Sequence, residues 1–397
     1  HALTRDFKMM DGPARRVLVD ALDLKRIFPA ARIPGAMFAA MRPERLLVGL
    51  MMVLFLVAVG RGWDGLGTPH IEVSSINGAE VLGDFDYTQQ MVMDGLGQIS
   101  QGVLAFDTAQ ILDGVKRIFI QLPSSLWNHS RSFLVMYGLV LVFVLGIVGG
   151  GVARLEAERF GVEREVKLAD SMRWAFQRWK RLTGVILLPP ILILSLLVIP
   201  WFMGVLTYFP VIDVLISLVW GIALVFAFVA ALLMAAWCVS IPILIPAAAC
   251  ETGDPGETIV RSAGLVWRRP FSLLLYLVVA IISGVLGWLI VSGLVVFTLD
   301  SARYAGALCG SDFIAQVPGT QWPSLADVPL QRSSDELGMT ENASLGILNL
   351  WRTFVLAIGY GWLFSFFITA GTRVYLLQRS AVEGISEDDL GSPGPVG

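Results

Sequence analysis

Histidine and cysteine are the residue types that most directly indicate metal or haem chemistry, and this sequence contains only three of each. His1, His70 and His129 all lie outside the long apolar runs. A membrane helix that holds haem or copper needs a histidine inside the span, so we expect no cofactor. His70 is near Asp64 and Glu72, but no second histidine completes a metal site there, and a solvated loop histidine is expected. The cysteines form no C-x-x-C pair, so neither a thiolate metal site nor a disulfide framework is indicated.

Ionisable residues inside the apolar runs would indicate an ion-coupled carrier, because such groups line the path of the ion. The runs contain no such residue, and among the residues at their ends Asp213 and Arg373 are the candidates. Asp213 is expected to start a helix at the membrane interface, and Arg373 to mark the cytoplasmic end of the last span. The sequence has no G-x-S-x-G or H-E-x-x-H motif. We therefore expect a protein that is not an enzyme, with no catalytic residues.

The elements that would position any functional residue are long and apolar. Of the 397 residues, 55% are hydrophobic and only 15% are charged, whereas about a quarter of a soluble domain is charged. A helix needs about 20 apolar residues to cross the hydrocarbon. Uncharged runs occupy residues 46–60, 132–153, 182–212, 214–250, 270–299 and 353–372. The first run is short and spans if its flanking arginines snorkel or if the helix begins near Phe38. We therefore expect an all-α, polytopic transmembrane bundle of about six spans.

Prolines predict irregularities in the third and fourth runs. Proline removes a backbone hydrogen bond and clashes with the preceding helical turn. Pro189 and Pro190 should therefore kink the third span. Pro242 and Pro246 should end the fourth helix and leave an interfacial stretch up to Cys250.

The distribution of Lys and Arg predicts the orientation of the spans. Segments on one side hold 9, 8, 3 and 2 of these residues; they are residues 1–45, 154–181, 251–269 and 373–397. Segments 61–131 and 300–352, on what we call the far side, hold 4 and 3. Under the positive-inside rule, both termini are expected in the cytoplasm.

Two segments that precede odd-numbered spans share the pattern R-x-A-x-x-x-W-[KR]-R. The pattern occupies residues 173–181 and 261–269, and a weaker version occupies residues 36–43. It suits a short helix in the headgroup layer, with Trp at the interface and cations toward anionic lipid. The residues expected to anchor the chain to lipid are Arg173, Trp179, Lys180, Arg181, Arg261, Trp267, Arg268 and Arg269.

The even-numbered spans also resemble one another. Each contains an aromatic-Gly pair followed five residues later by Phe: Tyr137-Gly138 with Phe143, Trp220-Gly221 with Phe226, and Tyr360-Gly361 with Phe366. One interpretation is a unit of interfacial helix plus hairpin that is copied three times in parallel. The other is convergence, because membrane helices commonly carry aromatic residues at their ends and glycine at packing faces. The glycines expected to serve helix packing are Gly138, Gly146, Gly150, Gly221 and Gly361.

These patterns divide the chain into five parts. They are a cytoplasmic amphipathic segment (1–31, with a helix expected at 14–28), hairpin unit 1 (32–153, with the far-side insertion 61–131), hairpin unit 2 (154–250), hairpin unit 3 (251–379, with the far-side insertion 300–352) and an acidic Gly/Pro tail (380–397).

One short motif supports a family resemblance. Arg261-Ser262 and Arg269-Pro270 form an R-S-x-x-x-x-x-x-R-P segment that leads into a membrane helix. In this respect the chain resembles uncharacterised six-span proteins of the bacterial inner membrane. The resemblance implies the bacterial cytoplasmic membrane and brings no catalytic residues.

The function expected from these features is structural. The sequence favours a non-catalytic integral membrane subunit that scaffolds a larger complex, with membrane lipids and other membrane subunits as partners and no nucleic acid. The alternative is a permease or lipid-handling protein for a neutral or lipidic solute, and a membrane-embedded enzyme is a third possibility. A scaffold should be packed through its centre, whereas a permease should have a cavity near Pro189 and Pro190.

Overall fold

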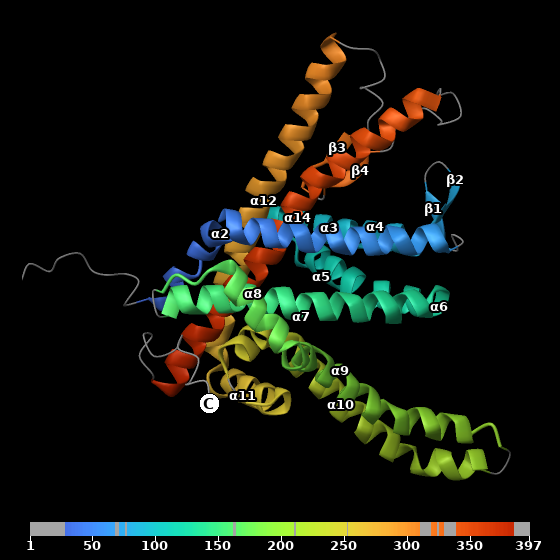
Figure 1. Cartoon of the computed structure of the whole chain (residues 1–397). Helices are drawn as coiled ribbons and strands as arrows, with labels where there is room; N and C mark the ends of the chain where they lie inside the picture. Colours follow the sequence, from blue (N-terminus) through green and yellow to red (C-terminus); the bar gives the residue numbers. More distant parts are fainter. Residues whose placement is uncertain are drawn as a thin grey trace, which may run out of the picture.

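The computed structural model describes residues 28–67, 71–75, 78–161, 164–209, 212–251, 253–309, 319–323, 325–328 and 339–384. Within these ranges, six helices are long and apolar enough to cross a membrane. They are α3 (Pro43–Leu66), α7 (Arg131–Gly161), α9 (Trp179–Leu206), α10 (Ile212–Cys250), α12 (Pro270–Cys309) and α14 (Met339–Glu383) (Figure 1). The prediction of an all-α polytopic bundle of six spans is therefore confirmed. The helix expected at 14–28 and most of the tail 380–397 fall outside the described residues.

Shorter elements connect the six long helices. Before three of the long helices lie η1 (Pro29–Arg32) and α2 (Gly35–Ala40), α8 (Leu168–Gln177), and α11 (Pro255–Arg268). Between α3 and α7 lie the antiparallel strands β1 (Ile71–Ser75) and β2 (Gly78–Leu82), then α4 (Asp84–Ala105), α5 (Thr108–Lys116), the π-helical turn η2 (Arg117–Gln121) and α6 (Leu122–His129). Between α12 and α14 lies a second antiparallel pair, β3 (Gly319–Gln321) and β4 (Ala326–Val328).

The first span is longer than its uncharged run. Helix α3 has 24 residues, with Pro43 in its first turn and both Arg45 and Arg61 inside it. Proline suits the first helical turn, where a backbone N–H has no helical partner in any case. The charged residues therefore sit within the helix and do not limit it.

Helix α10 contradicts the expectation that Pro242 and Pro246 end it, because the helix continues to Cys250 over 39 residues. Around these prolines it packs against α14. A Cβ on Gly371 would lie only 2.1 Å from the carbonyl oxygen of Pro242, so the missing side chain allows a very close approach. Packing against neighbouring helices is what makes proline tolerable within a membrane helix. Helix α9 also continues through Pro189 and Pro190, and the kink expected there stays a prediction.

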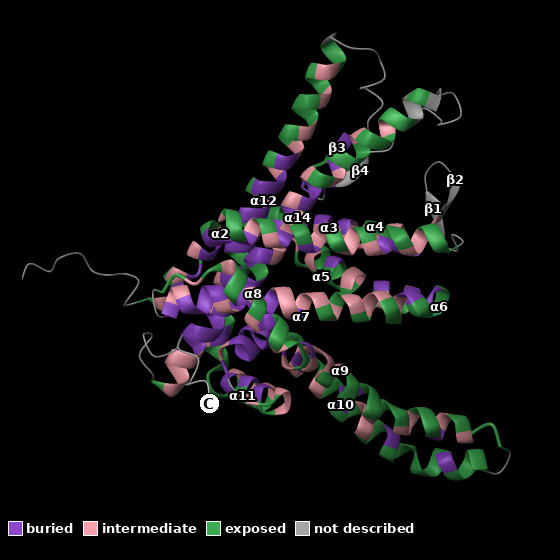
Figure 2. Cartoon of the chain, in the orientation of Figure 1, coloured by how far each residue is buried: buried purple, intermediate pink, exposed green. Residues whose placement is uncertain are grey.

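Helix α14 is the central element. It contacts α2, α3, α7, α10 and α12. In its apolar window 61% of the residues are buried, against 11–39% in the other five spans. We call the place where residues 361–378 of α14 meet these helices the hub. Trp362 and Tyr375 are completely buried there, and Figure 2 shows the buried residues concentrated where the helices converge.

Away from the hub, the long helices separate. The α9–α10 hairpin extends in one direction, and α12 with the outer half of α14 extends in another (Figure 1). Large side chains near the tip of the hairpin are exposed, such as Tyr208 and Leu218. The largest part of the packed core thus lies around the hub, with smaller clusters around Phe133 on the far side and around Ile216 in the hairpin, and the outer halves of the helices present apolar surface.

The contact between α3 and α14 is a contact of backbones. A Cβ on Gly361 would lie 2.6 Å from the amide nitrogen of Leu50, and one on Gly49 would lie 2.3 Å from the carbonyl oxygen of Gly361. Membrane helices approach this closely only where both faces carry small residues.

We predict that Gly361→Ala destabilises the protein by about 1–3 kcal/mol, because the added methyl group must push the two backbones apart. The matched control is Gly221→Ala, since a Cβ there meets no atom within 4 Å, and its effect should stay within about 0.5 kcal/mol. Thermal denaturation of the purified protein in detergent measures both. Equal midpoints for the two variants would contradict the close contact.

Candidate functional site

The most deeply buried charges of the described structure meet at the hub. Glu156 of α7 lies between Arg45 of α3 and Arg373 of α14. Arg45 Nη2 is 2.5 Å from Glu156 Oε2, and Arg373 Nε donates to Glu156 Oε1 at 2.6 Å. The exposed fractions of Glu156 and Arg45 are only 1% and 2%. Arg45 also donates to the hydroxyl of Thr369 on α14, at 3.4 Å.

Arg373 has further contacts that position it. Its Nη1 donates to the backbone carbonyl of Arg32 at 2.7 Å, and its guanidinium lies 5.1 Å from the ring centre of Phe160. Gly35 leaves room for it, because a Cβ there would be 2.6 Å from Nη1. The sequence predicted only a marker of the cytoplasmic end, whereas the structure makes Arg373 a partly buried partner in an ion cluster.

This cluster binds three spans together. A buried carboxylate is stable only when it is paired and hydrogen-bonded, and Glu156 meets both conditions through two arginines. Because the three side chains come from α3, α7 and α14, none of these helices can shift at the hub without breaking a charged contact. In the sequence, Arg45 and Glu156 lie at or just beyond the ends of uncharged runs. Because charged residues delimit the predicted spans, both fell outside them and neither was predicted to be buried.

A second charged network joins α10, α11 and α14. Glu251, directly after α10, accepts a hydrogen bond from the Tyr375 hydroxyl at 2.6 Å and lies 3.4 Å from Arg261 Nε. Arg261 and Arg379 both bind Glu383, each at 2.8 Å. The hydrogen bond to Glu383 raises the pKa of Arg261 above its ordinary value. This network ties the short helix α11 to the central helix.

The predicted lipid anchors fall into two groups. Arg261 is directed to carboxylates of the protein, and Arg181 is half-buried with Nη2 3.5 Å from the Thr258 hydroxyl. The remaining six are exposed: Arg173, Trp179, Lys180, Trp267, Arg268 and Arg269. Contact of these six with lipid stays a prediction.

The predicted packing glycines also differ among themselves. Gly146 and Gly150 face α9, where an ideal Cβ on Gly150 would come within 2.5 Å of a side chain. Gly361 lies in the backbone contact with α3 described above. Gly138 and Gly221 have no atom within 4 Å of an ideal Cβ, so no described helix packs closely on them. Their aromatic-Gly pattern therefore does not correspond to one shared packing contact.

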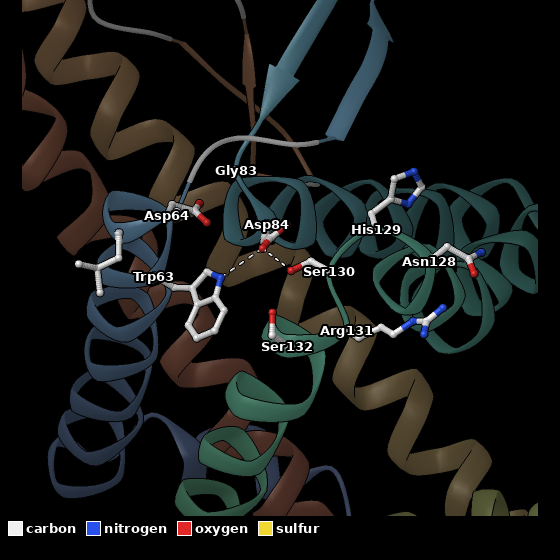
Figure 3. A pocket seen from close by; sticks show the side chains of 11 residues that line it. Trp63, Asp64, Gly83, Asp84, Asn128, His129, Ser130, Arg131 and Ser132 are labelled. Atoms are coloured by element: carbon white, nitrogen blue, oxygen red, sulfur yellow. Dashed lines mark hydrogen bonds between the residues drawn. The ribbon is translucent and has the colours of Figure 1, made fainter.

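On the far side, a hollow of about 630 Å³ lies where α3 ends and α4 and α7 begin. Figure 3 shows Asp84 between Trp63 and Ser130 at this place. Asp84 is buried, and its Oδ2 accepts hydrogen bonds from Trp63 Nε1 at 3.2 Å and from the Ser130 hydroxyl at 2.6 Å. One carboxylate thus joins three segments of the chain.

A neighbouring carboxylate fixes the start of α4. Both oxygens of Asp64 accept backbone hydrogen bonds, from Phe85 at 3.0 Å and from Asp86 at 3.1 Å. The first N–H groups of a helix have no partner within it, and a negative charge there is favourable. The far-side insertion is therefore held against the end of α3.

The geometry of the hollow does not form a serine–histidine pair. His129 Nδ1 donates to the carbonyl oxygen of Ser125 at 2.8 Å, and Ser130 donates to Asp84. In a serine–histidine pair the serine would donate to the imidazole that takes its proton. Figure 3 shows the His129 ring directed away from Ser130. Across the described parts of the chain, no three His, Cys, Asp or Glu residues gather as a metal site.

We predict that Glu156→Gln lowers the free energy of unfolding by about 3–5 kcal/mol, because it leaves the buried guanidinium of Arg45 and the partly buried guanidinium of Arg373 without their carboxylate. Glu44→Gln is the matched control, since Glu44 is exposed in the first turn of α3 and its loss should cost no more than about 0.5 kcal/mol. Thermal denaturation in detergent again provides the measurement. If both variants unfolded at the same temperature, the cluster would not stabilise the hub.

Comparison with known proteins adds no relative. The chain matches no protein-family model, no curated protein and no solved structure. The function must therefore be argued from the arrangement of the helices and side chains described above.

Proposed function

We propose that the chain is a non-catalytic integral membrane subunit that scaffolds or stabilises a larger membrane protein complex. The observation that carries this proposal is the filled hub. Where a carrier would need a path for its solute, α14 lies backbone to backbone against α3 and is pinned by the Glu156 cluster. Close packing and fixed charges suit a rigid part better than a moving one.

The rival proposal, a permease, requires a cavity near the prolines of α9. The hollow at Pro189 has a volume of only about 110 Å³ and a lining that is mostly apolar, including Leu192 and Trp237. Small-molecule sites typically occupy about 300–1,000 Å³. The size of this hollow therefore favours the subunit over the permease.

The surfaces available to partners lie away from the hub. The apolar window of α10 is only 11% buried, and the α9–α10 hairpin extends from the packed end (Figure 1). We propose that other membrane subunits and lipids cover this hairpin, and that the far-side insertions contribute further contacts.

We also propose a bacterial cytoplasmic membrane, with both termini in the cytoplasm. Support comes from the excess of Lys and Arg on the hub side and from the short motif at residues 261–270. The threefold repeat stays a proposal as well. The short helices α2, α8 and α11, which precede α3, α9 and α12, are consistent with it.

The orientation predicts which engineered cysteines a membrane-impermeant maleimide reaches in intact cells. With the native cysteines replaced, Asp113→Cys on the far side should be labelled and Lys180→Cys on the hub side should not, although both positions are exposed. Permeabilised cells, in which both should react, provide the control. If Lys180→Cys alone were labelled in intact cells, the proposed orientation would be wrong and the opposite one would hold.

The subunit proposal predicts that other membrane proteins are extracted in detergent as a complex with this chain. Gentle detergent extraction of a tagged chain from its native membrane, followed by size separation and mass spectrometry, should yield other membrane proteins in fixed stoichiometry. The same preparation from cells with the untagged chain gives the background. A lone particle or a homo-oligomer would refute the subunit proposal and direct attention to transport of lipidic and neutral solutes.

A further inference from the structure

A cleft opens between α3 and α14 on the far side of their crossing. The two helices touch at Gly49 and Gly361 and then diverge (Figure 1). Two adjoining hollows of about 210 Å³ and 900 Å³ lie in this wedge. We call them together the α3–α14 cleft; the residues that line both are Val57, Arg61, Arg352 and Thr353.

The depth of the cleft follows from helix geometry. A helix rises 1.5 Å per residue, so Arg61 lies about 24 Å beyond Arg45 along α3. By the same rise, Arg352 lies about 32 Å before Arg373 along α14. These lengths are close to the hydrocarbon thickness of about 30 Å. With the hub at one membrane surface, both arginines of the cleft reach the headgroups of the other.

The walls of the cleft below this level are mostly apolar, although Thr88 and Gln89 of α4 also line the inner hollow. The inner hollow includes Val53, Leu356 and Ala357, and the outer hollow includes Leu54 and Phe354. Among the described residues that line the two hollows, arginine is the only charged type. The cleft thus combines a positive mouth with a mostly apolar interior.

The two arginines are held differently. Arg352 is only 8% exposed and lies 3.5 Å from the Thr320 hydroxyl. The side chain of Arg61 is 59% exposed and lies 3.4 Å from Asp86. A long, exposed ion pair of this kind is weak, so Arg61 can turn toward an anion in the cleft.

We propose that the α3–α14 cleft binds an anionic phospholipid of the far-side leaflet. Its phosphate lies between Arg61 and Arg352, and one acyl chain follows Val57 toward the crossing at Gly49 and Gly361. Space between diverging helices in a bilayer fills with lipid, and a basic pocket between helices selects acidic headgroups. A zwitterionic lipid gains less, because none of the described residues that line the two hollows is a carboxylate that could bind its cationic group, and the nearby Asp86 is paired with Arg61. This inference is independent of the proposed subunit function.

Quenching of Trp351 fluorescence by brominated lipids tests the proposal, because Trp351 lines the outer hollow and is exposed. The delipidated full chain in detergent is titrated with brominated phosphatidylglycerol or brominated phosphatidylcholine. Subtraction of the same titration with Trp351→Phe isolates this tryptophan from the other eleven. We expect saturable quenching, with a half-saturating concentration of phosphatidylglycerol about fivefold below that of phosphatidylcholine.

Variants assign the preference to the cleft. Arg61→Gln should abolish it, and Asp86→Asn should strengthen it by removing the competing carboxylate. The control is Arg131→Gln, an exposed far-side arginine that lines the other hollow, which should leave the preference unchanged. Because the side chain of Arg61 is exposed, Arg61→Gln should fold normally. Arg352→Gln provides a second test, provided that the helix content of this variant equals that of the unmodified chain.

Three results would overturn the proposal. One is equal quenching by the two lipids in the unmodified chain. Another is a preference that survives Arg61→Gln. The third is an equal loss in Arg61→Gln and Arg131→Gln, which would assign the preference to the general charge of the far side.

Discussion

The carboxylate of Glu156, enclosed between two arginines, is the constraint on which the architecture depends. A charge that is 1% exposed can exist only where its partners are held in place. The partners come from helices at opposite ends of the sequence, so their pairing closes the chain on itself at the hub. The network around Glu251 repeats this arrangement for α10 and α11. One end of the molecule is thus fixed by charge as well as by packing.

The glycine contact beside this cluster determines what happens at the other end. Because α3 and α14 touch at Gly49 and Gly361 and do not run parallel, they must separate with distance from the crossing. The same contact therefore closes the centre of the bundle and opens the cleft below Arg61 and Arg352. A filled centre favours a scaffold, and an open periphery provides surface for lipid and protein neighbours. Both properties follow from one crossing.

The far-side insertion is attached by polar groups of a different kind. Asp64 caps α4, and Asp84 collects hydrogen bonds from the ends of two spans. Each of these carboxylates connects segments of the chain through hydrogen bonds. Their geometry explains why a hollow that contains serine, histidine and aspartate is compatible with a structural function.

The six apolar helices and the residues that border them can be predicted from local sequence, because hydrophobic length is a local property of the chain. The sequence alone could not determine which charges pair, since Glu156 and Arg373 are 217 residues apart and meet only through the crossing of their helices. For the same reason it predicted a helix end at Pro242, where tertiary contact with Gly371 lets the helix continue. Likewise, Gly138 and Gly361 share one sequence pattern, yet only the fold brings another backbone to Gly361. Partner choice depends on helix crossing, and helix crossing is decided by the packing of the whole bundle.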